Sequence, residues 1–147
     1  MLEIHKTVAK LYEDNKEYLE IFECLDEFSD TENFCNHYGF DIEDSCNAIL
    51  IKAKKPVEFY AMFCLLGASR LDVNHKAKEA MGAKRVSFAS RDEAELVTKQ
   101  IYGGISPLGL PENIKVFIDK NVIEREKLFI GAGNRVSKFF LSPETLI

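Results

Sequence analysis

Residues 101–111 read IYGGISPLGLP, and this stretch constrains the chain more strongly than any other. Gly103 and Gly104 can adopt positive φ values and let another molecule approach the main chain closely. Pro107 fixes its own φ and pushes Ser106 toward an extended conformation. We therefore predict a stiff loop with backbone N–H groups open to solvent, where such donors can hold a phosphate, a ribose oxygen or a carbonyl.

Two familiar glycine motifs do not fit this loop. No lysine stands where a P-loop needs one, and the glycine spacing differs from the G-x-G-x-x-G of a Rossmann nucleotide site. A tight turn that merely links a helix to a strand is the simpler interpretation. The loop alone does not decide between a binding site and a connection.

The bulk composition is that of one globular domain. The 147 residues, 46% of them hydrophobic and 29% charged, can enclose one core and exclude a disordered chain. No apolar run approaches the roughly 20 residues needed to cross a bilayer, and residues 1–22 lack the apolar centre of a secretory signal. We expect a cytoplasmic protein with no membrane contact.

The cysteines do not form a recognisable metal site. None belongs to a C-x-x-C pair or stands at zinc-site spacing from a histidine, so we expect buried, reduced thiols. We accordingly expect neither a metal nor another cofactor. The four residues are Cys24, Cys35, Cys46 and Cys64.

Charge is divided unevenly along the chain. Residues 1–48 contain 3 Lys and Arg against 13 Asp and Glu, a balance of −10, whereas residues 49–147 contain 16 against 11, a balance of +5. A polyanionic partner would therefore meet the second part of the chain. A solvated acidic helix ahead of an ordinary domain explains the same numbers equally well.

Apolar periodicity and turn residues predict an α+β domain. Ser29 with Glu32, and Ser90 with Glu93, have the spacing of capping boxes that begin helices. We predict helices over 3–27, 29–39, 72–81 (stopped by Gly82) and 90–100, a last turn at Pro143, and strands over 48–53, 57–66, 85–89, 114–119, 127–133 and 136–142. Lys54, Lys55 and Pro56 are expected to turn the chain between the first two strands.

The order of these elements indicates the fold class. Several strands follow one another without a helix between them, which favours a curled, barrel-like mixed β-sheet with flanking helices over a doubly wound sheet. We expect a single domain over 1–147, with an N-terminal helix over 1–28 ahead of the remainder, 29–147.

Three motifs carry a resemblance to a known family: the GGISPLG loop, the segment from LDVN to MGAKRVSFAS, and the GAGNR turn. Together they resemble the aminoacyl-tRNA editing family, which includes the YbaK-like proteins and the insertion domain of bacterial prolyl-tRNA synthetases. The resemblance covers roughly residues 29–147 and implies a closed-up mixed sheet that hydrolyses the ester of mischarged tRNA. It implies the aminoacylated 3′ end of tRNA as partner, with a synthetase as a second candidate, and we expect a free monomer.

The resemblance also implies a site. The G-x-x-x-P loop of the family holds the terminal adenosine and the aminoacyl carbonyl, and the glycine turn before the last strand looks like the other wall of the same cleft. The expected catalytic residues are Asn47, Gly103 and Gly104, and the expected substrate-binding residues are Ile105, Ser106, Pro107, Gly131, Gly133, Arg135 and Lys138. Lys84, Arg85 and Lys99, with Arg135 and Lys138, are candidates to guide tRNA.

Asn47 is the largest departure from the family. Most active members carry a lysine here, whereas this chain reads DSCNAILIK. Asparagine donates and accepts hydrogen bonds but carries no charge. Lys138, in the last predicted strand, is the candidate to supply that charge, and a solvated strand lysine is the simpler reading of it.

The expected chemistry needs no Ser-His-Asp set, because an aminoacyl ester is already activated and fixed N–H donors can stabilise the developing oxyanion. His5, His37 and His75 are accordingly expected at surfaces or helix ends. Three functions stay open: a deacylase acting in trans, a catalytically impaired homologue that binds a nucleotide-like or aminoacyl ligand, and a partner protein that docks through its acidic N-terminal helix. In the last case Tyr12, Tyr18 and Phe22 would form the apolar stripe.

Overall fold

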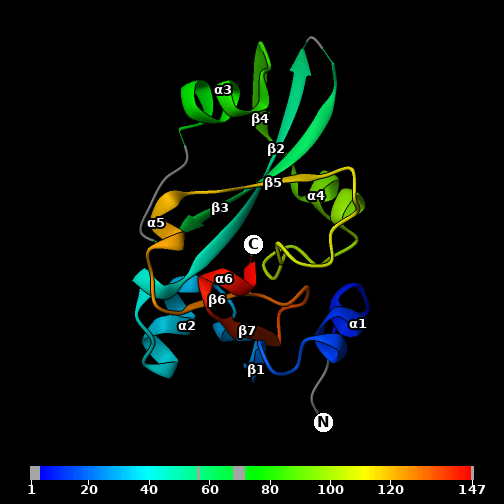
Figure 1. Cartoon of the computed structure of the whole chain (residues 1–147). Helices are drawn as coiled ribbons and strands as arrows, with labels where there is room; N and C mark the ends of the chain where they lie inside the picture. The colour runs from blue at the N-terminus through cyan, green and yellow to red at the C-terminus, as the bar shows by residue number, and fades with distance from the viewer. Residues whose placement is uncertain (1–3, 56, 68–71, 147) are drawn as a thin grey trace.

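Two β-sheets form the frame of the molecule, and helices flank them (Figure 1). The computed structural model describes residues 4–55, 57–67 and 72–146. The strands are β1 (Glu20–Glu23), β2 (Cys46–Lys55), β3 (Phe59–Leu66), β4 (Arg85–Phe88), β5 (Lys115–Ile118), β6 (Leu128–Gly131) and β7 (Ser137–Leu141). The α-helices are α1 (Lys6–Asp14), α2 (Thr31–Tyr38), α3 (Lys78–Met81), α4 (Arg91–Thr98), α5 (Lys120–Ile123) and α6 (Pro143–Leu146), and a π-helical turn over Val73–Ala77 precedes α3.

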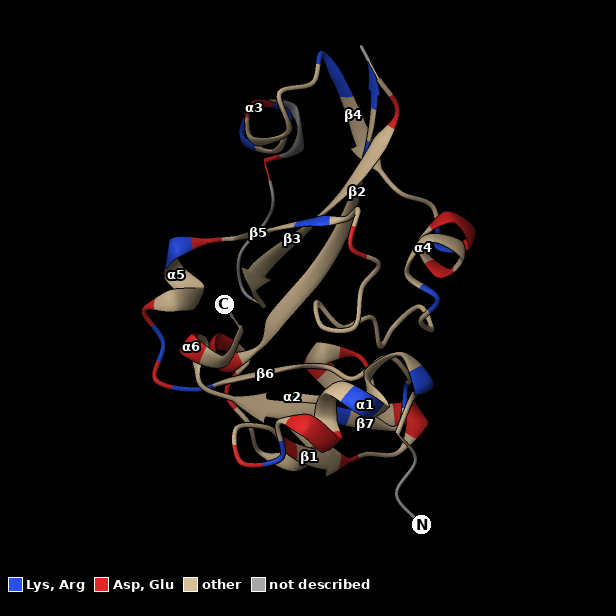
Figure 2. Ribbon diagram, turned by 45° about the vertical axis from the view of Figure 1, so that its right-hand side comes forward, with Lys and Arg blue, Asp and Glu red and all other residues tan. Residues whose placement is uncertain are grey.

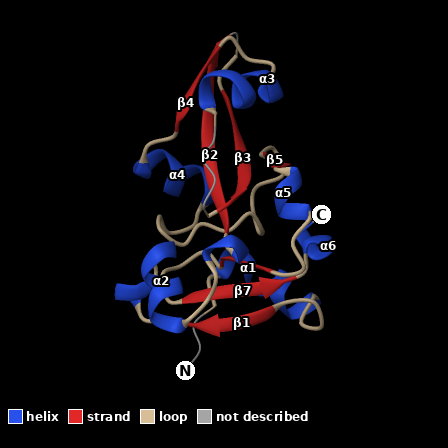
Figure 3. Ribbon diagram, turned by 90° about the vertical axis from the view of Figure 1, so that its left-hand side faces the viewer, coloured by secondary structure: helices blue, strands red, loops and turns tan. Residues whose placement is uncertain are grey.

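The larger sheet is mixed and the smaller one is antiparallel. Strand order is β4-β2-β3-β5 in the larger sheet, where β5 runs parallel to β3, and β1-β7-β6 in the smaller sheet. The small sheet runs across the base of the long β2–β3 hairpin (Figure 3), and a parallel bridge between Ser45 and Phe129 joins the two. The α+β prediction of a curled mixed sheet is therefore confirmed, although the sheets do not close into a barrel.

The predicted helix over 3–27 is wrong in its second half. Helix α1 ends at Asp14, where the Asn15 side chain donates a hydrogen bond to the carbonyl of Leu11 (2.8 Å). The chain then forms β1, which pairs with β7. The apolar spacing of Leu19 and Phe22 is compatible with either structure, and strand pairing with β7 decides it.

The N-terminal segment packs on the core formed by the rest of the chain. Val8 is completely buried, and the ring of Tyr12 stacks on Phe139 with centroids 5.8 Å apart. Phe22 lies in a strand, where its ring contacts four other aromatic rings. The three residues predicted as the apolar stripe of a docking helix do not share a helix: Tyr12 lies in α1, Phe22 in β1 and the exposed Tyr18 in the turn between them, and Tyr12 and Phe22 pack against the core.

The predicted helix ends and capping boxes are confirmed where the partner is a near neighbour in sequence, and one is wrong where the side chain bonds a distant residue. Ser90 and Glu93 form the predicted capping box of α4, and Gly39 and Gly82 end their helices in the left-handed conformation. The predicted capping box of α2 is wrong: its N-cap is Asp30, and the Ser29 hydroxyl instead donates to the carbonyl of Gly103 (3.4 Å).

Some predicted features lie outside the described residues, namely Pro56 of the hairpin turn and Leu71 of the LDVN segment. Four short elements were absent from the prediction: β1, α5 and the 3₁₀ turns over Asp26–Phe28 and Ile42–Asp44. All four cysteines are buried and unpaired, as predicted. Among the helices that the structure describes, none is long and apolar enough to cross a membrane.

Removal of buried contacts tests whether α1 belongs to the core. We expect Val8→Ala to lower the free energy of unfolding by about 2–3 kcal/mol, because about 0.8 kcal/mol is lost per buried methylene and a cavity remains. The control Lys10→Ala, at an exposed position of the same helix, should leave the free energy of unfolding nearly unchanged. Equal urea-denaturation midpoints for both variants would show that α1 is not part of the folding unit.

Glu93 connects α4 to the large sheet through hydrogen bonds, and its ionisation makes the folding stability depend on pH. One Glu93 oxygen accepts from Lys52 Nζ (2.9 Å) and Tyr60 OH (2.8 Å), and the other accepts from the Ser90 N–H (3.2 Å). The hydrogen bond from Lys52, followed by those from Ser90 and Tyr60, lowers the pKa of Glu93 from 4.5 to about 2. Because the folded-state pKa is the lower one, this stabilisation is complete above about pH 4.5 and is lost as pH falls toward about 2.

We therefore expect Glu93→Gln to flatten the dependence of unfolding free energy on pH between 4.5 and 2 relative to wild type. Urea denaturation at several pH values in that window measures this slope. Glu32→Gln, at an exposed position without an ion pair among the described residues, is the control and should keep the wild-type slope. A wild-type slope in Glu93→Gln would contradict the assignment.

Candidate functional site

The loop over residues 101–111 is bonded to the turn between β6 and β7. Gly133 N–H donates to the carbonyl of Gly104 (2.7 Å), and Ile101 N–H donates to the carbonyl of Gly133 (2.8 Å). Gly103 adopts a φ of +93°, which favours glycine. The two glycine-rich segments are thus joined main chain to main chain, although they are about 30 residues apart in sequence.

Two positions in this contact have no room for a side chain. A Cβ at Gly104 would collide with the carbonyl oxygen of Asn134. A Cβ at Gly131 would lie 2.6 Å from the carbonyl oxygens of both Gly104 and Ile105, closer than real Cβ contacts come. Glycine is therefore required at both positions for the loop to lie on β6.

A buried glutamine braces the loop from inside. The Gln100 side chain, 2% exposed, accepts from Ser106 N–H (2.5 Å) and donates to the carbonyl of Leu108 (2.9 Å). Ser106 Oγ in turn accepts from Leu108 N–H (3.1 Å). Ser106 is fully buried, so it and the adjoining Pro107 shape the loop and do not line the cleft.

The loop amides are only partly open, contrary to the simplest sequence-based expectation. Tyr102 N–H donates to the carboxylate of Glu95 (2.8 Å), and Gly104 N–H donates to the carbonyl of Ile101 (3.0 Å). With Ser106 and Leu108 also bonded internally, the N–H groups of Gly103 and Ile105 are left without a hydrogen-bond partner among the described residues. Along the loop, the two N–H groups without a partner therefore alternate with N–H groups whose internal hydrogen bonds fix the backbone.

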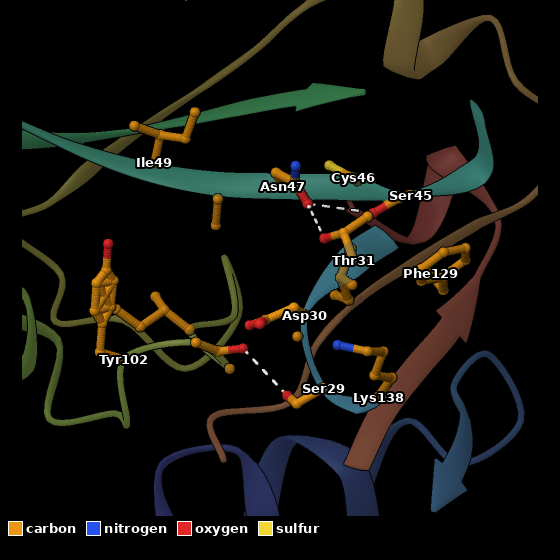
Figure 4. A pocket seen from close by; sticks show the side chains of 16 residues that line it. Ser29, Asp30, Thr31, Ser45, Cys46, Asn47, Ile49, Tyr102, Phe129 and Lys138 are labelled. Carbon is orange, nitrogen blue, oxygen red and sulfur yellow. Dashed lines mark hydrogen bonds between the residues drawn. The ribbon is translucent and has the colours of Figure 1, made fainter. Parts of the chain in front are cut away.

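A cleft of about 350 Å³ lies beside these two amides (Figure 4). The loop forms one wall, the start of β2 and the start of α2 form the second, and β6 and β7 form the third. The lining residues are Ser29, Asp30, Thr31, Ser45, Cys46, Asn47, Ala48, Ile49, Tyr102, Gly103, Gly104, Ile105, Phe129, Ile130, Gly131 and Lys138. Hydroxyl, amide, carboxylate and ammonium groups therefore converge on one hollow.

Asn47 opens β2 at the rim of this cleft. Its Oδ1 accepts from Thr31 Oγ1 (3.1 Å) and from Ser45 Oγ (3.2 Å) (Figure 4). Its Nδ2 has no hydrogen-bond partner among the described residues. The two hydroxyls thus orient the amide and leave its two N–H donors for a ligand.

Lys138 is the cation of the cleft. Its side chain is 6% exposed, extends from β7 toward the side where Ser29 and Asp30 lie (Figure 4), and places Nζ 5.0 Å from the ring centroid of Phe34. No described residue forms a hydrogen bond or an ion pair with this ammonium group, and burial lowers its pKa. An unpaired buried charge is costly, so the cleft favours a ligand with an anionic or acceptor oxygen.

The remaining predicted residues lie apart from the cleft or behind it. Gly133 supports the loop through its two hydrogen bonds. Arg135 pairs with Asp26 (2.9 Å) and Asp30 (3.5 Å) and lines a neighbouring hollow. Lys84 and Arg85 lie near the far end of the hairpin, where β4 begins and Arg85 is the strand partner of Lys55 (Figure 2). This position is about 26 Å along β2 from Asn47 at 3.3 Å per residue.

Several cleft residues had no signal in the sequence. Ser29, Thr31 and Ser45 look like ordinary turn and cap residues in the sequence, which predicts Ser29 as a helix cap. Tyr102 lies within the loop over residues 101–111, but only its glycine, serine and proline neighbours indicate a site. The three histidines do not line the cleft: His5 caps α1, and His37 stacks on Phe28.

Comparison with known proteins connects this geometry to a family. Residues 26–147 match the family model of the aminoacyl-tRNA editing domain. Over 58 residues the chain is 37% identical to the proline–tRNA ligase of Streptococcus pneumoniae (strain Hungary19A-6), a match that covers 40% of this chain and 9% of that protein. The chain therefore spans less than a tenth of the length of the curated relatives it matches.

The fold is similar to crystal structures of low sequence identity. The hypothetical protein APE2540 superposes with a TM-score of 0.85 at 20% identity, covering 96% of this chain and 91% of that one. A protein described as a candidate trans-editing enzyme for prolyl-tRNA synthetase superposes with a TM-score of 0.81 at 16% identity, covering 98% and 91%. Because the family model spans the loop, the glycine turn and the start of β2, this chain belongs to the aminoacyl-tRNA editing domain family.

Proposed function

We propose that this protein hydrolyses the ester bond of mischarged aminoacyl-tRNA, acting in trans on tRNA released by a synthetase in the cytoplasm. The observation that carries the proposal is the cleft in which the unpartnered amides of Gly103 and Ile105 meet the amide of Asn47 and the ammonium of Lys138. Family membership and the similarity to parts of proline–tRNA ligases support the same substrate class.

The proposed chemistry depends on fixed donors. The ester carbonyl lies against the N–H groups of Gly103 and Ile105, which receive the oxyanion when water attacks. Their positions are set by the Gly104–Gly131 contact and by Gln100, so they need no reorganisation during the reaction. The adjacent ribose hydroxyl activates the ester, and no nucleophilic side chain is required.

Asn47 and Lys138 divide the role that one lysine has in most active relatives. The Asn47 amide donates to a carbonyl or hydroxyl of the aminoacyl end, and the Lys138 ammonium supplies the positive charge from the opposite wall. Both side chains are prepositioned, Asn47 by Thr31 and Ser45 and Lys138 by the sheet and Phe34. In this proposal the positive charge reaches the cleft from β7 instead of from β2.

Asn47 also favours a second function, in which the cleft binds an aminoacyl or nucleotide-like ligand without hydrolysis. A panel of mischarged tRNAs distinguishes the two. Hydrolysis of at least one substrate supports the deacylase, whereas retained binding of aminoacylated tRNA without turnover of any substrate assigns the binding module.

The loop contact provides a first prediction of activity. Gly131→Ala places a methyl group against the carbonyls of Gly104 and Ile105 and should displace the two open amides, which lowers kcat by roughly 10²–10³-fold. Gly82→Ala is the matched control, because its Cβ meets nothing and only its positive φ costs about 1–2 kcal/mol of stability. Equal single-turnover deacylation rates for the two variants would remove the loop from the mechanism.

Lys138 provides a second prediction, with opposite effects on activity and stability. Lys138→Met keeps the shape of the side chain and removes a buried unpaired charge, so the melting temperature should stay the same or rise. Deacylation should fall by roughly 10²-fold or more. Lys54→Met, which removes an exposed strand lysine, should leave both quantities unchanged, and wild-type activity in Lys138→Met would contradict the assigned role.

A further inference from the structure

A second hollow, of about 380 Å³, adjoins the cleft. It is lined by Asp30, Arg91, Tyr102, Gly103 and Arg135. Asp30, Tyr102 and Gly103 line both hollows, so the two are compartments of one continuous surface. A linear ligand whose terminal unit occupies the cleft can therefore place its next unit in the second compartment.

Helix α4 fixes an aromatic ring in this compartment. Arg91 and Glu95 are four residues apart and share a helix face, and both contact Tyr102. Glu95 accepts a hydrogen bond from the Tyr102 N–H (2.8 Å), and the Arg91 guanidinium lies 5.8 Å from the centroid of the Tyr102 ring. The ring is 46% exposed, so it is held by its neighbours and still presents a surface to a ligand.

The two arginines of the compartment differ in whether a carboxylate pairs with the guanidinium. The Arg135 guanidinium donates to the carboxylate (2.9 Å) and to the backbone carbonyl (3.2 Å) of Asp26, and it forms an ion pair with Asp30 (3.5 Å). Arg91 is exposed and forms no ion pair with any described residue. Arg91 is therefore the cation of this compartment that is available to a phosphate.

An exposed ring beside an unpaired guanidinium has the two features that bind single-stranded nucleic acid. Bases of any identity stack on aromatic rings, and arginine contacts the phosphates between them. We propose that the second compartment is a nucleotide site: the base before the terminal adenosine stacks on Tyr102, and the phosphate joining the two lies against Arg91. This assignment rests on the proposed function, because it takes the cleft as the site of the terminal adenosine.

Equilibrium binding of two unacylated probes, the trinucleotide CCA and adenosine alone, tests the site without requiring hydrolysis. We expect Tyr102→Ala to weaken CCA binding roughly 5- to 100-fold, the range typical of losing one stacked base, and to leave adenosine binding unchanged. Tyr102→Phe keeps the ring and should bind CCA like wild type. Arg91→Ala should weaken CCA binding and reduce by about one the number of ions released in a salt titration.

Three results would overturn the nucleotide site. The first is wild-type CCA affinity in Tyr102→Ala, and the second is an equal loss of CCA and adenosine binding in that variant, which would indicate collapse of the loop. The third is a wild-type protein that binds CCA no more tightly than adenosine. Because these probes carry no ester, a protein that binds them as expected but hydrolyses nothing refutes the deacylase and leaves the nucleotide site in place.

Discussion

The candidate site depends on one contact between two stretches of main chain. The loop at Gly104 lies directly on Gly131 and Asn134, and it is held there by hydrogen bonds that join Gly104 and Ile101 to Gly133. Only glycine permits this approach. The contact fixes the two unpartnered amides at Gly103 and Ile105, and it places β6 and β7, with Lys138, opposite the loop.

The acidic N-terminal segment supports this contact from behind. Gly109, with a φ of +71°, has no room for a Cβ because the carbonyl of Thr7 lies against it. Gly133 packs in the same way on the ring of His5. Helix α1 and the residue that caps it therefore support both glycine segments, and the apolar face of α1 joins the core.

The charges around the site are arranged in two different ways. Arg135 is paired with the carboxylates of Asp26 and Asp30 and so ties the start of α2 to the turn between β6 and β7, and Asp30 lines both compartments. Lys138 and Arg91 have no such partners among the described residues, one buried and one exposed. A buried cation without a partner, such as Lys138, lowers the stability that the fold could otherwise reach, and the proposed negatively charged ligand would offset that cost.

Elements whose signals are local could be predicted from the amino-acid sequence. Gly39 and Gly82 end helices because a left-handed residue disfavours a Cβ, and Ser90 with Glu93 begins α4 because each side chain bonds the other's backbone. The glycine loop, the β2–β3 hairpin and the family resemblance follow from the same short-range patterns. These features need only neighbours within a few residues.

Features that depend on distant partners could not be predicted, because they are set by contacts that form only in the folded chain. Residues 20–23 are compatible with a helix until β7 pairs with them, and Ser29 is a plausible cap until Gly103 offers it a carbonyl. Which loop amides stay open depends on Glu95, Gln100 and Gly133, and the position of the Lys138 ammonium depends on Phe34 and the strands beside it. Chain folding brings these groups together from separations of tens of residues, and no local pattern encodes that proximity.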